Sequence, residues 1–317
     1  MISILLPTLR VGGLDVLCDS LSRQTCQDFE LLLADGIHRY RAPLVADKLA
    51  VLPFPVRHLA SDGIALSNYS RSINDAVVVA RGDVILMMPD YAWLADDTVE
   101  IHARFHDEHR GERKCLMSGY TYRACPPRHP GFEGYHPRKQ HSQVEFHRDD
   151  PEALWELYTT REAERYERDL ASGALDALMW SIWAEPLTLE ALQQLPIEHE
   201  HKLFDVEWSH RFCSLKNESY PIEAWEELNG LDEDLDGSHL YQDLEWGERL
   251  HRTERWTWER IRGGEITVVN PRPFFACKRM LRPLRLNESI AELKRVTGAA
   301  VNPGWSLRER RAAHHAV

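Results

Sequence analysis

Short apolar runs alternate with helical patterns through the first 120 residues of the chain. Such alternation is typical of βαβ units, whose strands pair in parallel. The apolar runs predict strands at residues 2–7, 29–36, 55–60, 84–88 and 114–122, and the helical patterns predict helices at residues 14–25, 67–82 and 96–109. We therefore expect an α/β fold in which helices flank a Rossmann-type, mostly parallel sheet.

Proline, serine and glycine set the predicted ends of these elements. Pro7 should close the first strand, because proline has no N–H to donate to a neighbouring strand. Ser67 is a candidate N-cap for the helix after the third strand, and Gly82 is the expected stop of that helix. The expected buried face of the helix carries Tyr69, Ile73, Ala76 and Ala80.

The run at residues 84–88 is apolar at every position and then meets Pro89 and Asp90. Such a run suits a strand that is buried on both faces of a parallel sheet. An aspartate after a proline is most simply a turn residue. Ligands of open parallel sheets, however, bind beyond the carboxyl ends of the strands. Asp90 is therefore also a candidate ligand-binding residue, together with Thr8 and Asp35, which end the first two predicted strands.

The middle of the chain loses this regularity. Residues 124–150 are rich in proline, glycine and histidine, and a loop of that length is usually functional or mobile. Asp150–Pro151 predicts the start of a charged helix that runs to about Leu170. The apolar segment at residues 175–195 should pack against the rest of the protein.

Composition places the chain among soluble globular proteins, with 43% apolar and 28% charged residues. Its six cysteines show no C-x-x-C spacing, which indicates reduced thiols rather than a zinc ribbon or a disulfide framework. The amino terminus does not resemble a signal peptide, and no apolar run reaches the roughly 18 residues that span a bilayer. We expect a cytoplasmic protein without a transmembrane segment.

Charge is unevenly distributed along the chain. The net charge of −12 argues against unspecific nucleic-acid binding over the whole surface. Residues 276–317, in contrast, hold nine lysines or arginines against three glutamates. This basic extension is either a solvated face or a contact surface for a phosphate-bearing acceptor or an anionic membrane.

Residues 3–36 combine a strand, a Pro–Thr pair, a helix with the pattern SL..QT..DFE, and a second strand that ends in aspartate. This order resembles the opening of family 2 glycosyltransferases, which are nucleotide-sugar enzymes of the GT-A fold. The resemblance implies that Pro7, Thr8 and Asp35 cradle the uridine of a UDP-sugar donor. Asp35 would form a hydrogen bond to the base.

Two further blocks follow in the order expected for that family. Residues 73–90 resemble the block that leads to the metal site, which implies donor-side positions for Asn74 and for Arg71, the nearby cation that could face phosphate. Residues 216–250 resemble the acceptor-side signature, in which Asp243 would be the general base. The other candidates on the acceptor or phosphate side are Lys216, Asn217, Gln242, Trp246 and Arg249.

The proposed role of Asp243 agrees with the chemistry. Inverting sugar transfer needs a carboxylate that takes a proton from the acceptor hydroxyl as this oxygen attacks. Asp243 lies in the first turn of a predicted helix, where the partial positive charge favours the ionised carboxylate that a base must be. A first-turn aspartate that only stabilises its helix is the alternative.

Two positions depart from the family pattern. The family's metal motif is usually Asp-x-Asp, but here Pro89 and Tyr91 flank a single Asp90. Either Asp90 alone approaches a Mn²⁺ or Mg²⁺ that the diphosphate already holds, or the enzyme works without a metal. The second departure is Gln242, which stands where a glutamate commonly precedes the base.

Several other side chains have two interpretations. His239 and His251 lie near the proposed base in sequence and could approach a metal or phosphate, or be polar surface. Lys216 and Arg249 could pair with phosphate or with the many nearby carboxylates. Trp208, Trp225 and Trp246 could form a stacking platform for a sugar or base, or belong to the core.

The expected organisation is a donor half at residues 1–123, an insertion at 124–205, an acceptor and catalytic half at 206–275, and the basic extension at 276–317. The insertion could form a lid or bind the acceptor. The expected reaction moves one hexosyl or pentosyl group from a UDP-sugar to an acceptor hydroxyl, with inversion. The acceptor could be a glycan, a lipid-linked sugar, a protein or a modified nucleic-acid base.

Two alternatives remain for the function. The incomplete metal motif is compatible with a binding protein for nucleotide sugars that has lost the transfer reaction. A nucleotidyltransferase of the same fold is disfavoured, because no glycine-rich loop with a lysine follows the first strand.

Overall fold

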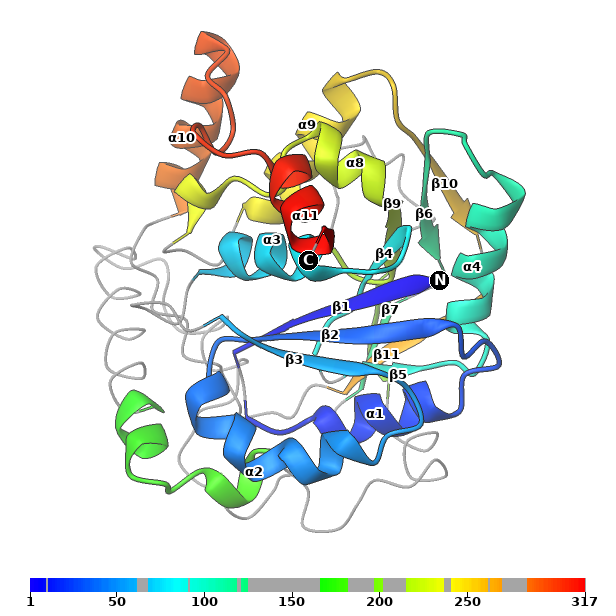
Figure 1. Cartoon of the computed structure of the whole chain (residues 1–317), viewed down its shortest axis with the longest axis vertical. Coiled ribbons are helices and arrows are strands. Elements are labelled where there is room, and N and C mark those ends of the chain that lie inside the picture. Colours follow the sequence, from blue (N-terminus) through cyan, green and yellow to red (C-terminus); the bar gives the residue numbers. More distant parts are fainter. Residues whose placement is uncertain are drawn as a thin grey trace.

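The computed structural model describes residues 1–9, 11–61, 68–90, 92–118, 121–124, 166–181, 197–201, 215–236, 241–261, 263–269 and 284–316. Within these ranges, seven strands form the main sheet in the order β10-β6-β9-β4-β1-β2-β3 (Figure 1). Their bounds are β1 Ile2–Thr8, β2 Phe29–Asp35, β3 Val56–Ala60, β4 Val84–Met87, β6 Lys114–Ser118, β9 Glu218–Pro221 and β10 Thr257–Ile261. The first four strands run parallel, and β9 lies antiparallel between β4 and β6. The predicted α/β class with a mostly parallel sheet is confirmed.

The unbroken apolar runs of the central strands serve two cores, one on each face of the sheet. Ile4 and Leu6 of β1 point into the core beneath α1 (Leu14–Ser22) and α2 (His38–Ala50), whereas Leu5 points into the opposite core. That second core lies against α3 (Tyr69–Val79), α8 (Ile222–Glu227), α9 (Gln242–Arg252) and α11 (Leu307–His315). Because successive side chains alternate between faces, a strand buried on both faces must be apolar throughout.

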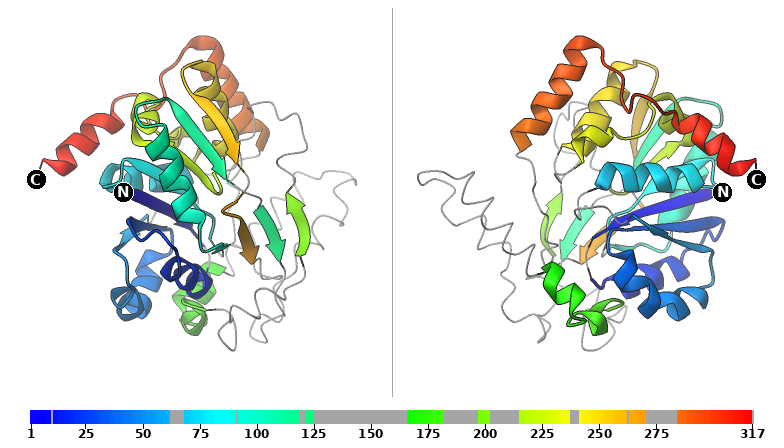
Figure 2. Two further views of the ribbon diagram at one scale, coloured as in Figure 1. Left: turned by 90° about the vertical axis from the view of Figure 1, so that its right-hand side faces the viewer. Right: turned by 60° about the vertical axis from the view of Figure 1, so that its left-hand side comes forward.

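A second, smaller sheet has the strand order β5-β11-β7-β8. Its strands are β5 Ala92–Leu94, β7 Thr121–Ala124, β8 Ile197–His201 and β11 Ile266–Val269. Figure 2 shows this sheet on the opposite side of the molecule from α11. Residues 114–122 were predicted as one strand, and this prediction was wrong. Segment 114–118 is β6 of the main sheet, and segment 121–124 is β7 of the small one.

The structure corrects two helix predictions. The pattern missed α2, whose interior contains Pro43 and whose buried positions Arg41, Val45 and Leu49 include a charged residue. Helix α3 ends at Val79, before the predicted stop at Gly82. A Cβ on Gly82 would lie 2.6 Å from the backbone nitrogen of Ser3, so this glycine permits close contact with β1.

The described part of the insertion belongs to the first core. The side chains of Tyr166, Leu170, Leu175 and Met179 are buried there with β1 and α1. The hydroxyl of Tyr166 donates to the Leu9 carbonyl at 3.0 Å. Most of the helix predicted for residues 151–170 lies outside the described residues, as do residues 124–150 except Ala124. The division of the chain into four parts stays a prediction.

The basic extension contains α10 (Leu284–Thr297) and α11, which packs against α3 and α8. In its described part, Arg308 and Arg311 both pair with Glu226, and Arg310 pairs with Asp75. These cations therefore neutralise carboxylates of the same chain. The predicted basic cluster at residues 277–286 falls outside the side chains that the structure describes. Among the described residues, no helix has both the length and the apolar character needed to cross a membrane.

Candidate functional site

Thr8, Asp35 and Asp90 lie together at the carboxyl ends of the parallel strands of the main sheet. Thr8 and Asp35 are register partners at the carboxyl ends of β1 and β2, and the Thr8 hydroxyl donates to Asp90 Oδ2 at 3.2 Å. The backbone N–H of Gly36 donates to the Thr8 carbonyl at 2.9 Å. The parallel strands thus bring together three residues that are far apart in sequence. Pro7 lies one position inside β1, opposite Ala34.

Asp35 is a buried carboxylate with several partners. Its Oδ1 accepts the Ile37 N–H at 3.0 Å, and its Oδ2 lies 2.8 Å from His58 Nε2 and 3.4 Å from Arg41 Nε. Burial alone would raise the pKa of Asp35, but the guanidinium of Arg41 and then the contacts with His58 outweigh it and hold that pKa below its usual value. Asp35 is therefore ionised at neutral pH.

Arg41 and His58 were missed by the sequence predictions. Arg41 lies in the unpredicted helix α2, and His58 lies in β3. The ring of His38, in the first turn of α2, packs against His58 with centroids 4.5 Å apart. The sequence did hold a signal for His58, which lies near the end of the strand predicted at residues 55–60. Strands that pair in parallel place their carboxyl ends at the same edge of a sheet, and Asp35 ends a neighbouring strand.

Asp90 is 8% exposed. No group of three or more histidine, cysteine, aspartate or glutamate side chains that could hold a metal occurs among the described residues. Asp90 and the Thr8 hydroxyl fit only a cation that takes most of its ligands from a bound phosphate, as magnesium commonly does. Tyr91 lies outside the described residues.

Asn74 and Arg71 connect α3 to the loop at residues 228–236. The Asn74 amide donates to the Leu231 carbonyl at 2.9 Å and to Glu233 Oε1 at 3.0 Å, and its oxygen accepts the Leu231 N–H at 2.8 Å. Arg71 Nε donates to Glu233 Oε2 at 3.2 Å, and its side chain is 62% exposed. The Asn74 amide therefore binds the loop at residues 228–236, whereas the Arg71 side chain remains largely exposed to solvent.

Asp243 lies in the first turn of α9, and its side chain is partly buried. Its Oδ1 accepts the Leu244 N–H at 2.9 Å. Gln242, beside it, is buried and donates to the Leu235 carbonyl at 3.1 Å. Gln242 thus anchors the start of α9 to the preceding loop.

Asn217 belongs to a buried polar cluster, and its place on the acceptor side stays a prediction. Its amide donates to the Gly264 carbonyl at 2.7 Å, and its oxygen lies 3.1 Å from His102 Nε2. Ser219 Oγ contacts both His102 and His106 of α4 (Thr98–Glu108). Burial lowers the pKa of His102 to about 3 and that of His106 to about 4, so both imidazoles are neutral. Lys216 precedes this cluster and is partly buried.

Trp246 and Arg249 each had two interpretations, and the structure shows a core ring for Trp246 and a carboxylate pair for Arg249. Trp246 is fully buried and stacks on Trp225 with ring centroids 4.3 Å apart, so both rings belong to the core and form no ligand platform. Arg249 pairs with Glu245 and donates to the carbonyls of Leu228 and Gly230. Arg249 thus binds its own chain rather than phosphate. Trp208 and His239 lie outside the described residues, and His251 is exposed.

No protein-family model matches the chain, and no curated protein matches it. Among solved structures, S. aureus TarS 1–349 in complex with UDP-GlcNAc is similar, with a TM-score of 0.50 and 12% identity over 98% of this chain and 69% of that one. A second structure of S. aureus TarS 1–349 gives a TM-score of 0.46 and 14% identity over 94% of this chain and 72% of that one. A further S. aureus TarS structure gives a TM-score of 0.44 and 12% identity, and the match covers 98% of this chain and 41% of that one. The likeness to the UDP-GlcNAc complex shows a shared α/β fold, and membership of family 2 remains a hypothesis.

Proposed function

We propose that the protein is a glycosyltransferase that moves one sugar from a UDP-sugar to an acceptor hydroxyl. The observation that carries this proposal is the joining of Thr8, Asp35 and Asp90 at the carboxyl edge of the sheet. The fold likeness to a structure solved with UDP-GlcNAc supports the choice of donor class.

On the donor side, Thr8 and Asp35 would line the uridine site. Asp35 is fully buried and holds Ile37, His58 and Arg41, so a hydrogen bond from the uracil N–H to its carboxylate would require these contacts to rearrange. Asp90 would face the diphosphate. Asp90 and Thr8 are the residues that would hold a divalent cation, and its charge would offset that of the departing UDP. Arg71, which is largely exposed and pairs with Glu233, is a second cation that could serve that purpose.

On the acceptor side, Asp243 would act as the general base. Its carboxylate takes the proton of the acceptor hydroxyl, the acceptor oxygen bonds to the anomeric carbon, and the bond from that carbon to the diphosphate oxygen breaks. Attack opposite the leaving group inverts the configuration. The first-turn position of Asp243 favours its ionised form, as this role requires.

A nucleotide-sugar binding protein without transfer activity is the second candidate. The single carboxylate of Asp90 and the commitment of Asn217 and Arg249 to protein contacts favour this alternative. Both candidates share the donor site and differ only in turnover.

The test is release of UDP from a panel of UDP-sugars, with candidate acceptors present and with or without Mn²⁺. We expect turnover with at least one donor, and we expect Asp243→Asn to lower kcat by a factor of about 100 or more while UDP still binds. Glu248→Gln is the control, because Glu248 lies in the same helix and pairs with Arg252.

Retained turnover in Asp243→Asn would remove Asp243 as the base. Binding of UDP without turnover of any donor would favour the binding protein. Absence of UDP binding to the wild-type protein would contradict both candidates.

A further inference from the structure

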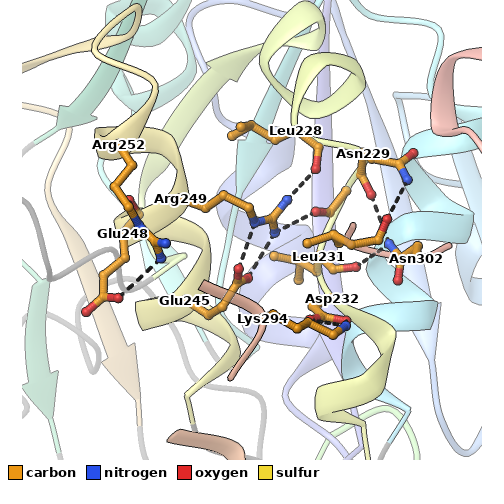
Figure 3. A network of polar contacts seen from close by, with 12 residues as sticks. Leu228, Asn229, Leu231, Asp232, Glu245, Glu248, Arg249, Arg252, Lys294 and Asn302 are labelled. Atoms are coloured by element: carbon orange, nitrogen blue, oxygen red, sulfur yellow. Dashed lines mark hydrogen bonds and ion pairs between the residues drawn. The ribbon is translucent and has the colours of Figure 1, made fainter. Parts of the chain in front are cut away.

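The loop at residues 228–236 lies between α8 and α9 and is held by polar contacts from three directions (Figure 3). Asn229 and Gly230 have φ values of 58° and 72°, so the backbone makes a tight left-handed turn there. A Cβ on Gly230 would lie 2.3 Å from Asn74 Oδ1, which excludes a larger residue at this turn. The carbonyls of this turn must find partners outside regular secondary structure.

Arg249 of α9 supplies one set of partners. Its guanidinium donates to the carbonyls of Leu228 and Gly230 and makes a two-pronged pair with Glu245 (Figure 3). Glu245 lies one helical turn before Arg249 and holds its guanidinium in place. The contacts of that guanidinium with the two loop carbonyls then fix the rotation of α9 relative to the loop. The first turn of α9, which carries Asp243, is thereby fixed as well.

Asn302, between α10 and α11, supplies the second set. Its amide nitrogen donates to the carbonyls of Asn229 at 2.9 Å and Leu231 at 2.8 Å, and its amide oxygen accepts the Glu233 N–H at 2.9 Å. Asn302 is only 5% exposed, and its φ of 49° is one that asparagine tolerates better than most residues. One side chain of the extension thus satisfies three backbone groups of the loop.

Lys294 of α10 supplies the third contact. Its ammonium lies 2.7 Å from both oxygens of Asp232 and 2.7 Å from Asp234 Oδ2. Asp232 is 1% exposed, and burial raises its pKa while Lys294 opposes that rise. Removing the ammonium would leave a buried carboxylate without its cation, and the loop would have to rearrange to rehydrate it.

We propose that Lys294 and Asn302 of the carboxyl-terminal extension are positioning residues for the reaction, which hold the 228–236 loop and, through Arg249, orient the turn of α9 that carries Asp243. This inference rests on the proposed function, because it assigns Asp243 the role of base. It gives the extension a part in catalysis that does not depend on binding of an anionic acceptor.

The first test compares Lys294→Met with Arg295→Met. The two residues are neighbours on α10, but Arg295 is 46% exposed and, in the part of the chain that the structure describes, pairs with Glu292 and not with the 228–236 loop. We expect Lys294→Met to lower kcat by about 10- to 100-fold with UDP affinity held within about twofold of wild type. Arg295→Met should change neither quantity. Lys294→Arg, which keeps the charge, should restore most of kcat.

A second variant covers the case in which Lys294→Met does not fold. Asn302→Asp keeps the size of the side chain but turns a carboxylate oxygen toward two carbonyls, and it should show the same loss of kcat with retained UDP binding. Unchanged kcat in both variants would overturn the proposal. A parallel loss of kcat and UDP binding that follows the folded fraction would also overturn it.

Hydrogen exchange distinguishes failure of this inference from failure of the proposed function. Lys294→Met should speed exchange of the α9 amides by about tenfold or more relative to wild type, with the β1 and β2 amides unchanged. If the wild-type protein turns over no UDP-sugar, the proposed function fails whatever the exchange result. If the α9 amides exchange at the wild-type rate, the positioning role fails whatever the activity.

Discussion

Asp35 illustrates, at the scale of a residue, how burial and charge act together at the donor edge. Its side chain and that of Arg41 are both fully buried, and the pair lies beside His58. An ion pair of this kind need not stabilise a protein more than apolar residues would, because both charges lose their hydration. Removal of one partner is costly, since the other is left buried and charged.

Replacement of Arg41 therefore gives a sharp prediction. Arg41→Met should lower the free energy of unfolding by about 3–5 kcal/mol, as measured by urea denaturation at pH 7. Arg39→Met is the matched control, because Arg39 lies on the exposed face of the same helix. Equal stability of the two variants would show that Asp35 does not depend on this cation.

The same pair predicts an acid dependence of stability. The pKa of Asp35 is lowered in the folded protein, so its ionised form contributes stability above the unfolded pKa of about 4. That contribution is lost as pH falls through the lower, folded pKa. In Arg41→Met the contribution should be absent, and stability should fall less steeply over this acidic range.

At the scale of elements, α11 packs against α3 and α8 and connects them. Arg311 donates to the carbonyls of Val77 and Ala80 at the end of α3 and pairs with Glu226 of α8. Cationic side chains at the carboxyl end of a helix offset its partial negative charge. The side chain of Arg311 is 12% exposed, whereas that of Arg308, which contacts the same glutamate, is 67% exposed.

Because these two arginines share one partner, their substitutions can be compared directly. Arg311→Ala should reduce the free energy of unfolding by about 1–3 kcal/mol, since it removes the guanidinium donor from the Ala80 carbonyl and breaks the pair with Glu226. Arg308→Ala should cost less than about 1 kcal/mol, as exposed ion pairs do. Denaturant titration of both variants measures the difference. An equal loss of stability in the two variants would argue against the role of Arg311 in connecting α3 and α8.

At the scale of the whole molecule, Asp236 connects the loop at residues 228–236 to the start of α3, which lies far away in the sequence. Its carboxylate accepts the backbone N–H groups of Ser70 at 2.7 Å and Arg71 at 3.1 Å, at the start of α3. Burial raises the pKa of Asp236 to about 7 despite these hydrogen bonds, and nearby Glu233 adds to the rise. This contact between the loop and α3 therefore titrates near neutral pH.

The sign of the resulting pH dependence follows from linkage. Between the unfolded pKa of about 4 and the folded pKa, the folded protein binds more protons at Asp236, so this residue makes stability fall as pH rises. Its largest contribution to the slope is about 1.4 kcal/mol per pH unit. In Asp236→Asn the free energy of unfolding, measured at pH 5, 6, 7 and 8, should depend less steeply on pH. An unchanged slope would contradict the raised pKa.

The sequence predicted the parallel strands β1 to β4. For β1, β2 and β4 the signal was a continuous apolar run, which strands buried in a parallel sheet need, whereas β3 is only partly buried and includes Arg57 and His58. The sequence also predicted the edge where Thr8, Asp35 and Asp90 lie, because such strands end together. It missed α2, where Pro43 and a buried Arg41 disturb the helical pattern. It could not predict that β9 lies between β4 and β6, since the pairing partner of a strand is not encoded in the strand's own pattern.

The sequence by itself determined the α/β class and the chemistry gathered at the carboxyl edge of the sheet, since both follow from local periodicity and strand direction. Only the tertiary structure decided which polar residues remain available to a ligand. Asn217 and Arg249 have side chains suited to binding, yet each is committed to partners within the protein. The physical reason is that buried polar groups must be paired, and the chain segments that pair them are brought together only by folding.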